Sequence, residues 1–237
     1  MSATRIASLL PVLALCTASV AFAACPIPTF LHGGLNPSLP LPVDAAACDT
    51  TIANPTCGTM HGRFLVGAGL VLAAAYSSCG GGGFSDVSGI ETIVEEDFTV
   101  SGPPAGTPVA FAAVLDVRGL AESFSEPGGG GGGRVRAIVS ESPANEIVAE
   151  RGTTGLDPSM SMTESLVLPV SALAGTPVRL RFATRAETFD GRAEIEGTFR
   201  FAGLPAGAMI TSCRGYSSDA PVAGRHSTWG RIKSLYR

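Results

Sequence analysis

Two late stretches of the chain alternate between apolar and charged residues, and this pattern constrains the fold more than any other feature of the sequence. The stretches cover residues 178–182 and 193–201. Their apolar positions are Val178, Leu180, Phe182, Ala193, Ile195, Phe199 and Phe201. The charged positions between them are Arg179, Arg181, Glu194, Glu196 and Arg200. Because successive side chains of a strand point to opposite faces, a period of two predicts strands with one buried face and one face in water.

The same period occurs upstream, between segments of turn-forming residues. Apolar residues alternate over 63–76, 97–100, 109–117 and 165–170, and the first of these runs would place Phe64 to Tyr76 on one face. Turn residues gather at 101–106, 174–177, 190–191 and 204–207. No segment has a sustained helical stripe. The pattern predicts an all-β fold, an antiparallel β-sandwich of jelly-roll-like type, over residues 61–215.

The first 25 residues indicate an export signal. A lone positive charge, Arg5, precedes an apolar run over residues 6–20 and the small-residue sequence Ala21-Phe22-Ala23-Ala24-Cys25. This arrangement predicts a signal peptide over residues 1–23, with cleavage before Ala24. Alternatively, Phe22-Ala23-Ala24-Cys25 resembles a lipobox, and Cys25 would then be lipidated.

Export sets the expected compartment. No later segment approaches the ~20 uninterrupted apolar residues that a spanning helix needs. We therefore expect a secreted or extracytoplasmic protein, in the periplasm or at the cell surface, without a transmembrane anchor after the signal is removed. A lipoprotein is the alternative, since Cys25 would become the new N-terminus.

Residues 24–60 differ from the later part of the chain because they are rich in proline and lack a clear period. Proline fixes its own backbone and biases the preceding residue towards extended conformations, so we expect an extended arm ahead of the sandwich. Two glycine tracts, Gly80–Gly83 and Gly128–Gly133, lack the Lys-Ser or Lys-Thr pair of a phosphate-binding loop. We expect both tracts to be mobile hairpin loops.

Cysteine pairing follows from the expected compartment. If Cys16 leaves with the signal, the mature chain keeps Cys25 and the four candidates for disulfides, which are Cys48, Cys57, Cys79 and Cys213. An exported chain normally pairs its thiols, and four cysteines allow three connectivities. We favour Cys48 with Cys57 across a short loop and Cys79 with Cys213 across the domain. No Cys-x-x-Cys pair is present, which argues against redox chemistry and a zinc knuckle.

Charge and composition exclude some classes of function. The net charge is -4, so the chain lacks the basic field that holds nucleic acid. Charged residues make up 15% of the sequence, against roughly 25% in ordinary soluble domains. Apolar residues reach 45%, which argues against disorder over most of the length.

No signature of catalysis or metal binding is found in the sequence. The three histidines, His32, His61 and His226, have no ligand spacing to one another, and neither His-Glu-x-x-His nor Gly-x-Ser-x-Gly occurs. The carboxylates of residues 95–97 are adjacent, so on a strand they point to opposite faces, and a solvated strand edge is the simpler interpretation. Asp86, Asp157 and Asp190 lack the Asp-x-Asp-x-Asp spacing of a calcium loop. We expect no catalytic residue, cofactor or metal.

Three segments carry a resemblance to a known family. They are Glu96–Gly102, Leu166–Val170 with Gly175–Val178, and Phe199–Gly207. These strand-and-turn patterns resemble the exported β-sandwich domains of bacterial PEP-CTERM-type surface proteins, over roughly residues 60–215. The chain lacks that family's tail, which has a Pro-Glu-Pro motif, a terminal apolar span and a basic cluster. The resemblance implies an exported sandwich and no catalytic residues to carry over.

The expected function is a non-catalytic structural or interaction role with an envelope or extracellular partner. A carbohydrate-binding module is the alternative, for which Tyr76 and Tyr216 are candidate contacts. Sugar sites usually need aromatic rings, and aromatic residues are 6% of this chain. A sheet face with two or more exposed rings would favour glycan binding, whereas a bare Ser, Thr and Arg face would favour a structural role.

The last segment, residues 216–237, joins a linker to a basic and aromatic tail. Its candidate recognition residues are Trp229, Ile232, Leu235, Tyr236 and Arg237. The segment is too short to be a stable helix alone, but it has the form of a docking or sorting tag. The alternatives are that Trp229 docks back on the sandwich or that the tail is disordered.

Overall fold

The computed structural model describes residues 13–16, 26–33, 39–54, 58–78, 88–125, 131–142, 144–153 and 157–218. These residues form antiparallel strands and one 3-10 turn, η1 (Val66–Ala68). No helix in this part of the chain is long and apolar enough to cross a membrane. The all-β antiparallel sandwich predicted from the alternating pattern is therefore confirmed.

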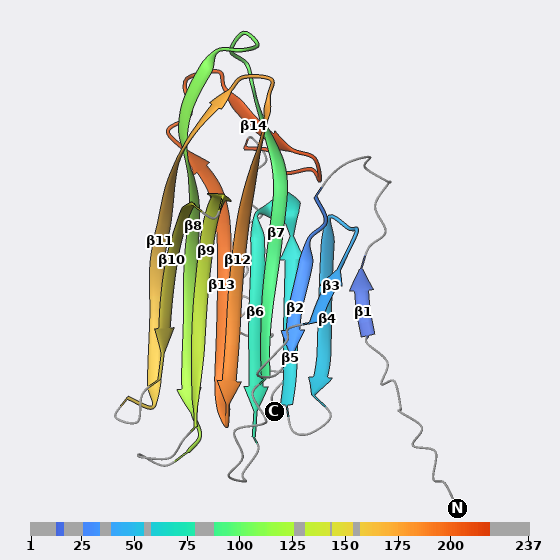
Figure 1. Ribbon diagram of the computed structural model, residues 1–237, viewed down its shortest axis with the longest axis vertical. Coiled ribbons are helices and arrows are strands. Elements are labelled where there is room, and N and C mark those ends of the chain that lie inside the picture. Colours follow the sequence, from blue (N-terminus) through green and yellow to red (C-terminus); the bar gives the residue numbers. More distant parts are fainter. Residues whose placement is uncertain are drawn as a thin grey trace, which may run out of the picture.

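Two sheets make up the sandwich, and in Figure 1 they lie one behind the other with their strands along the long axis. The first sheet contains, in order, β1 (Leu13–Cys16), β4 (Ala47–Asn54), β5 (Gly58–Leu65), β6 (Leu70–Ser77), β13 (Gly191–Ala202), β8 (Pro108–Ser123) and β11 (Ser159–Leu173). The second contains β10 (Asn145–Gly152), β9 (Gly132–Ser142), β12 (Pro177–Phe189), β7 (Ser88–Ser101), β2 (Thr29–Gly33) and β3 (Leu39–Pro42). A further strand, β14 (Met209–Ser212), also pairs with β7.

Aromatic side chains from both sheets fill the space between them. Phe98 of β7 contacts Phe182, Phe199 and Phe201 at ring-centroid distances of 6.0, 6.1 and 5.0 Å. Phe182 of the second sheet stacks on Phe199 of the first at 4.3 Å. Tyr216 is buried in the same cluster, so it is a core residue and not a sugar contact. The predicted core faces of β7, β8, β11, β12 and β13 are confirmed by the burial of their apolar residues.

The sandwich begins earlier than residue 61, where we expected it. Strands β2 and β3 extend the second sheet beside β7, and β4 pairs with β5 along residues 47–54 in the first. The proline-rich segment is therefore part of both sheets and not an arm ahead of them. Pro40 and Pro42 lie in β3, which ends the sheet, and an edge strand tolerates proline because its outer N–H groups need no ladder partner.

The run over residues 63–76 is two strands, not one face of alternating residues. Gly69 has φ 66° after the 3-10 turn, and a β-carbon there would lie 2.3 Å from the carbonyl oxygen of Phe199. Glycine alone accepts this position without strain, so the chain reverses there and β5 pairs with β6. Phe64 and Val66 face the core as expected, but the reversal shifts the pattern after them. Val71, Ala73 and Ala75 face the core in place of Leu72 and Ala74.

Two strands that were not predicted, β9 and β10, form the far edge of the second sheet. Gly132 and Gly133, at the end of the second glycine tract, begin β9 and are not a mobile loop. A β-carbon on Gly133 would lie 2.6 Å from the Arg192 carbonyl oxygen, so the close approach of the two sheets requires glycine. Gly80–Gly83 and Gly128–Gly130 lie outside the described residues.

Cys48 and Cys213 each take part in a disulfide bond. Cys57 and Cys79, the partners that we favoured, and Cys25 lie outside the described residues, so both pairings stay predictions. The tail residues Trp229, Ile232, Leu235, Tyr236 and Arg237 lie outside them too. Strand β1 falls within the predicted signal peptide and pairs with β4, so cleavage at residue 23 would leave β4 as the edge of the first sheet.

Candidate binding face

The outer face of the second sheet carries rows of charged side chains. On β12, Leu180, Phe182 and Ala186 face the core, so Arg181 and Arg185 between them point outward. Register places Arg185 opposite Glu91 of β7 on one side and Arg136 of β9 on the other. Glu150 of β10 lies opposite Arg136. One row of four charged residues, with a glutamate at each end and two arginines between them, therefore crosses four strands.

An apolar row lies directly beside this charged row. Register aligns Val148 of β10, Ile138 of β9, Ala183 of β12 and Ile93 of β7. Ile138 and Ala183 are 6% and 0% exposed although they point away from the main core. Long arginine and glutamate side chains cover such a row with their aliphatic stems while their charged ends stay in water. The outer face of the second sheet therefore includes a covered apolar row beside its charged row.

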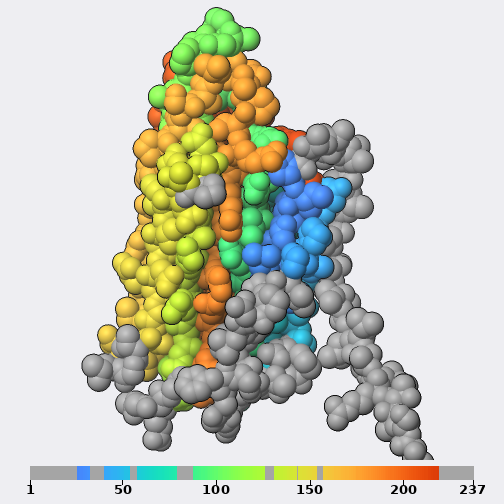
Figure 2. Space-filling model, in the orientation of Figure 1, coloured from blue at the N-terminus to red at the C-terminus, as the bar shows by residue number. Residues whose placement is uncertain are grey.

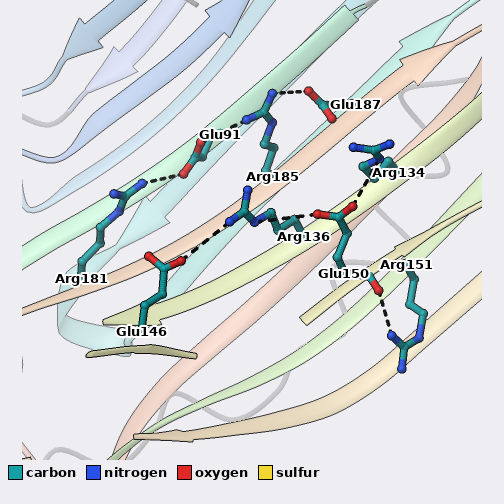
Figure 3. A network of polar contacts seen from close by, with 9 residues as sticks. All are labelled: Glu91, Arg134, Arg136, Glu146, Glu150, Arg151, Arg181, Arg185 and Glu187. Carbon is teal, nitrogen blue, oxygen red and sulfur yellow. Dashed lines mark hydrogen bonds and ion pairs between the residues drawn. The ribbon is translucent and has the colours of Figure 1, made fainter. Parts of the chain in front are cut away.

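Glu91 is the best-neutralised carboxylate of this face. Arg181 Nη2 donates to Glu91 Oε1 at 2.8 Å, and Arg185 Nη1 lies 3.9 Å from Glu91 Oε2. Arg185 also donates a hydrogen bond to Glu187, two residues further along β12. Figure 3 shows this set of contacts between β7 and β12 and a second, separate set on β9 and β10.

Arg134 and Arg136 are held much less tightly. The shortest carboxylate contact of Arg134 is 3.5 Å, from its Nε to Glu150 Oε1. Arg136 lies 3.8 Å from Glu146 Oε1 and 3.9 Å from Glu150 Oε2. A charge-assisted hydrogen bond is typically about 2.7–2.9 Å long, so these contacts leave donors available. In the described part of the chain, the buried Nε of Arg136 has no hydrogen-bond acceptor.

A pocket of about 130 Å³ lies where these side chains meet. Its lining consists of Arg134, Arg136, Glu150, Arg185 and Glu187. Figure 2 shows β10, β9 and β12, coloured from yellow to orange, at the surface of this face of the molecule. The pocket therefore opens on the accessible side of the second sheet and gathers three guanidinium groups and two carboxylates.

The described histidines and acidic turn residues considered in the sequence are not among the residues that line this pocket. His61 is on β5 in the first sheet, with its Nε2 at 2.6 Å from Asp49 Oδ1. Burial lowers the pKa of His32. Asp190 accepts a hydrogen bond of 2.6 Å from Ser125 Oγ. No group of three or more potential metal ligands is found among the described residues, and His226 and Asp86 lie outside them.

Two expectations about charged residues were wrong. Glu96, between Glu95 and Asp97 on β7, is 0% exposed and not part of a solvated edge. Glu194 of β13 is 3% exposed although its alternation predicted a face in water. Arg214 Nε lies 3.2 Å from Glu96 Oε1, and Arg192 Nε donates to Glu194 Oε1 at 2.6 Å. Each of these buried carboxyl groups thus lies beside an arginine, at a position that a period of two cannot reveal.

Exposed aromatic rings occur at one end of the first sheet. Phe124 is 46% exposed, and its ring centroid lies 5.5 Å from that of Tyr76, which is partly buried. The two rings are tilted by 56°, so they do not form one flat surface for a sugar ring. Phe30, Phe64, Phe98, Phe182 and Phe199 are fully buried. The aromatic platform that would favour stacking of a neutral sugar is therefore not formed by this pair.

The residues that line the pocket on β9 and β10 were not predicted from the sequence. A signal was present, because Arg134 and Arg136 alternate with Val135 and Ala137 as residues of an amphipathic strand do. Glu146 and Glu150 are four residues apart and so share one face of a strand. The glycine tract before Arg134 instead predicted a mobile loop.

Comparisons with known proteins leave the family open. No protein-family model matches the chain, and no curated protein matches it. Among solved structures, the chain is similar to TmCBM61 in complex with β-1,4-galactotriose, with 15% sequence identity and a TM-score of 0.26. The match covers 61% of this chain and 86% of that chain. The resemblance to PEP-CTERM-type surface proteins stays a prediction.

Proposed function

We propose that the chain is an exported, non-catalytic β-sandwich protein that binds carbohydrate with the outer face of its second sheet. The observation that supports this proposal is the arrangement of arginine donors and glutamate acceptors around the pocket on β9, β10 and β12. The compartment rests on the signal sequence at residues 1–23.

Sugar hydroxyl groups suit this arrangement because each can donate one hydrogen bond and accept two. Arg134 and Arg136 supply only donors, and Glu150 supplies only acceptors, with all three around one pocket. A ligand with many hydroxyl groups can accept from the first two and donate to the third. Recognition would then depend on hydrogen bonds to charged groups, in place of the stacking that Phe124 and Tyr76 do not provide together.

The carboxylates of this face favour binding over catalysis. A glycoside hydrolase usually needs two carboxyl groups on either side of the scissile bond, one as acid and one as base or nucleophile. Glu91, Glu150 and Glu187 instead each lie next to one or more arginines. Such ion pairs hold a carboxylate in place as a hydrogen-bond acceptor.

A structural or protein-interaction role is the second candidate, and strand β11 favours it. Ser161, Thr163 and Ser165 on its outer face are exposed, as on the bare Ser and Thr face expected of a structural protein. Arg151 Nη2 of β10 and Glu164 Oε1 of β11 lie 2.6 Å apart and join the two sheets at this edge. A protein partner of β11 would not depend on the pocket.

Affinity electrophoresis of the purified protein, in gels with different soluble polysaccharides, tests the proposal. We expect at least one polysaccharide to retard the protein, and the variant Arg185→Gln to reduce the retardation. Arg200→Gln is the matched control, because Arg200 is a partly exposed arginine paired with Asp116 at 2.8 Å on the outer face of the first sheet. Equal mobility in every gel, or equal loss in both variants, would contradict carbohydrate binding by this face.

A further inference from the structure

We infer that the ligand is a polysaccharide with carboxylate groups, of the uronate class, and that Arg134 and Arg136 bind one of its carboxylates. This inference rests on the proposed function and names the ligand class of the same site. It is carried by the charge of the pocket and by the loose contacts of these two arginines.

The pocket carries an excess of positive charge in an acidic chain. Three guanidinium groups and two carboxylates line it, whereas the whole chain has a net charge of -4. Arg136 and Arg185 lie directly opposite each other on neighbouring strands, a like-charge pair that is unfavourable without an anion nearby. Arg185 has Glu187 and Glu91 for this purpose, whereas Arg134 and Arg136 have only the longer contacts with Glu150, and Arg136 with Glu146 at 3.8 Å.

The geometry of the free donors fits a carboxylate. A guanidinium group has five N–H donors in a planar fork, and it typically binds carboxylates through two parallel hydrogen bonds. The ion pairs of Arg134 and Arg136 are 3.5–3.9 Å long, which leaves these bonds unmade within the described residues. A ligand carboxylate between the two side chains would supply the missing acceptors.

The size of the pocket agrees with a small charged group. Its volume of about 130 Å³ is several times the ~10–15 Å³ that one water molecule needs by the same measure. A carboxylate with the edge of its sugar ring can therefore enter, while the rest of the polymer lies along the sheet. Glu150 and Glu187 in the lining are then acceptors for ring hydroxyl groups.

A protein partner fits this face less well. Protein interfaces are centred on apolar and aromatic anchors, and charged residues are depleted from their cores. Here the exposed large apolar residue is Val148, at 41%, while Ile93 and Ile138 are covered. A hydrated polymer of hydroxyl and carboxylate groups requires no apolar anchor and complements donors and acceptors alike.

The test compares three polysaccharides by isothermal titration with the full exported protein. They are polygalacturonate, its methyl ester, which keeps the hydroxyl groups without the charge, and neutral galactan. Hydrogen bonds to charged groups are strong enough that we expect polygalacturonate to bind about tenfold or more tighter than its ester at low salt. The preference should shrink as salt screens the charges.

Variants assign the preference to the pocket. We expect the double variant Arg134→Gln/Arg136→Gln to lose the preference for the free acid, and Arg200→Gln to keep it. Arg134→Gln alone is a second variant that is safe for folding, because the Arg134 side chain is 60% exposed, and it should weaken the preference in part. Melting temperatures establish that each variant is folded.

Each outcome separates this inference from the proposed function. Equal affinity for the acid, the ester and galactan would overturn the uronate assignment and leave carbohydrate binding intact. If the protein binds none of the three and no other polysaccharide in the gels, both the uronate assignment and carbohydrate binding are overturned. Equal binding of polyglutamate, which has carboxylates without sugar hydroxyl groups, would overturn the polysaccharide assignment in favour of an acidic protein.

Discussion

Glu96 makes the stability of this protein depend on pH. Its side chain is 0% exposed on the core-facing side of β7, and desolvation raises its pKa from 4.5 to about 7 although Arg214 opposes the rise. Arg214 Nε lies 3.2 Å from Glu96 Oε1 but donates its hydrogen bond to the Pro26 carbonyl oxygen at 3.1 Å. The ion pair is therefore too weak to offset the cost of burying the charge.

The size of the effect follows from the two pKa values. In the folded state Glu96 keeps its proton up to about pH 7, whereas in the unfolded chain it loses the proton near 4.5. The stability that protonated Glu96 provides is fully present below pH 4.5, declines as the pH rises and is lost once the pH passes about 7. A rise from 4.5 to about 7 corresponds to about 3 kcal/mol, at about 1.36 kcal/mol per pKa unit.

The variant Glu96→Gln removes this titration and keeps the shape of the protonated side chain. Arg214 retains a counter-charge, since its Nη1 lies 2.9 Å from Asp44 Oδ1. Urea denaturation of both proteins between pH 4.5 and 8.5 should show the variant gaining stability relative to the native chain, by about 3 kcal/mol over the series. Glu95→Gln is the control, because the Glu95 side chain is 39% exposed and should leave the pH dependence unchanged. Parallel curves for Glu96→Gln and the native chain would refute the reasoning.

Three further predictions concern the turn at Gly69, the disulfides and the tail. Gly69→Ala should lower the free energy of unfolding by about 2 kcal/mol or more, because its left-handed φ of 66° strains other residues and the β-carbon meets Phe199; an unchanged urea midpoint would contradict this. Non-reducing digestion and mass spectrometry should find two intramolecular disulfides that include Cys48 and Cys213, each stabilising by ~2–4 kcal/mol; four free thiols would show the prediction to be wrong. Deletion of residues 225–237 should leave the melting temperature nearly unchanged and alter where the protein accumulates, as measured by fractionation; a large loss of stability with unchanged localisation would make Trp229 a core residue.

The local pattern of the sequence predicted the core faces of several strands but not every strand of the two sheets. Phe98, Phe182 and Phe199 were assigned to core faces because their neighbours alternate with polar residues. Strands β2 and β3 of the proline-rich segment were not predicted, since proline, which lies within β3, opposes a regular strand except at an edge. Whether a segment lies at an edge is a property of the sheet, not of the segment.

The candidate site was largely hidden for the same kind of reason. Exposed arginines and glutamates are ordinary on any strand, and Arg179 and Arg181 were expected only to face water. Their importance depends on which strands are neighbours, because the pocket forms where Arg136 of β9 meets Arg185 of β12 and Glu150 of β10. No local period specifies that pairing.

The sequence by itself determined the class of fold, the export signal that we expect and the faces of most strands, because alternation and turn chemistry act over a few residues. The tertiary structure decided the order of strands, the pocket and the buried ion pairs. Arg214 contacts the Pro26 carbonyl oxygen across 188 residues of sequence, and it approaches Glu96 within the same cluster. Such contacts depend on how two whole sheets pack, and this arrangement brings together side chains whose spacing along the chain carries no signal.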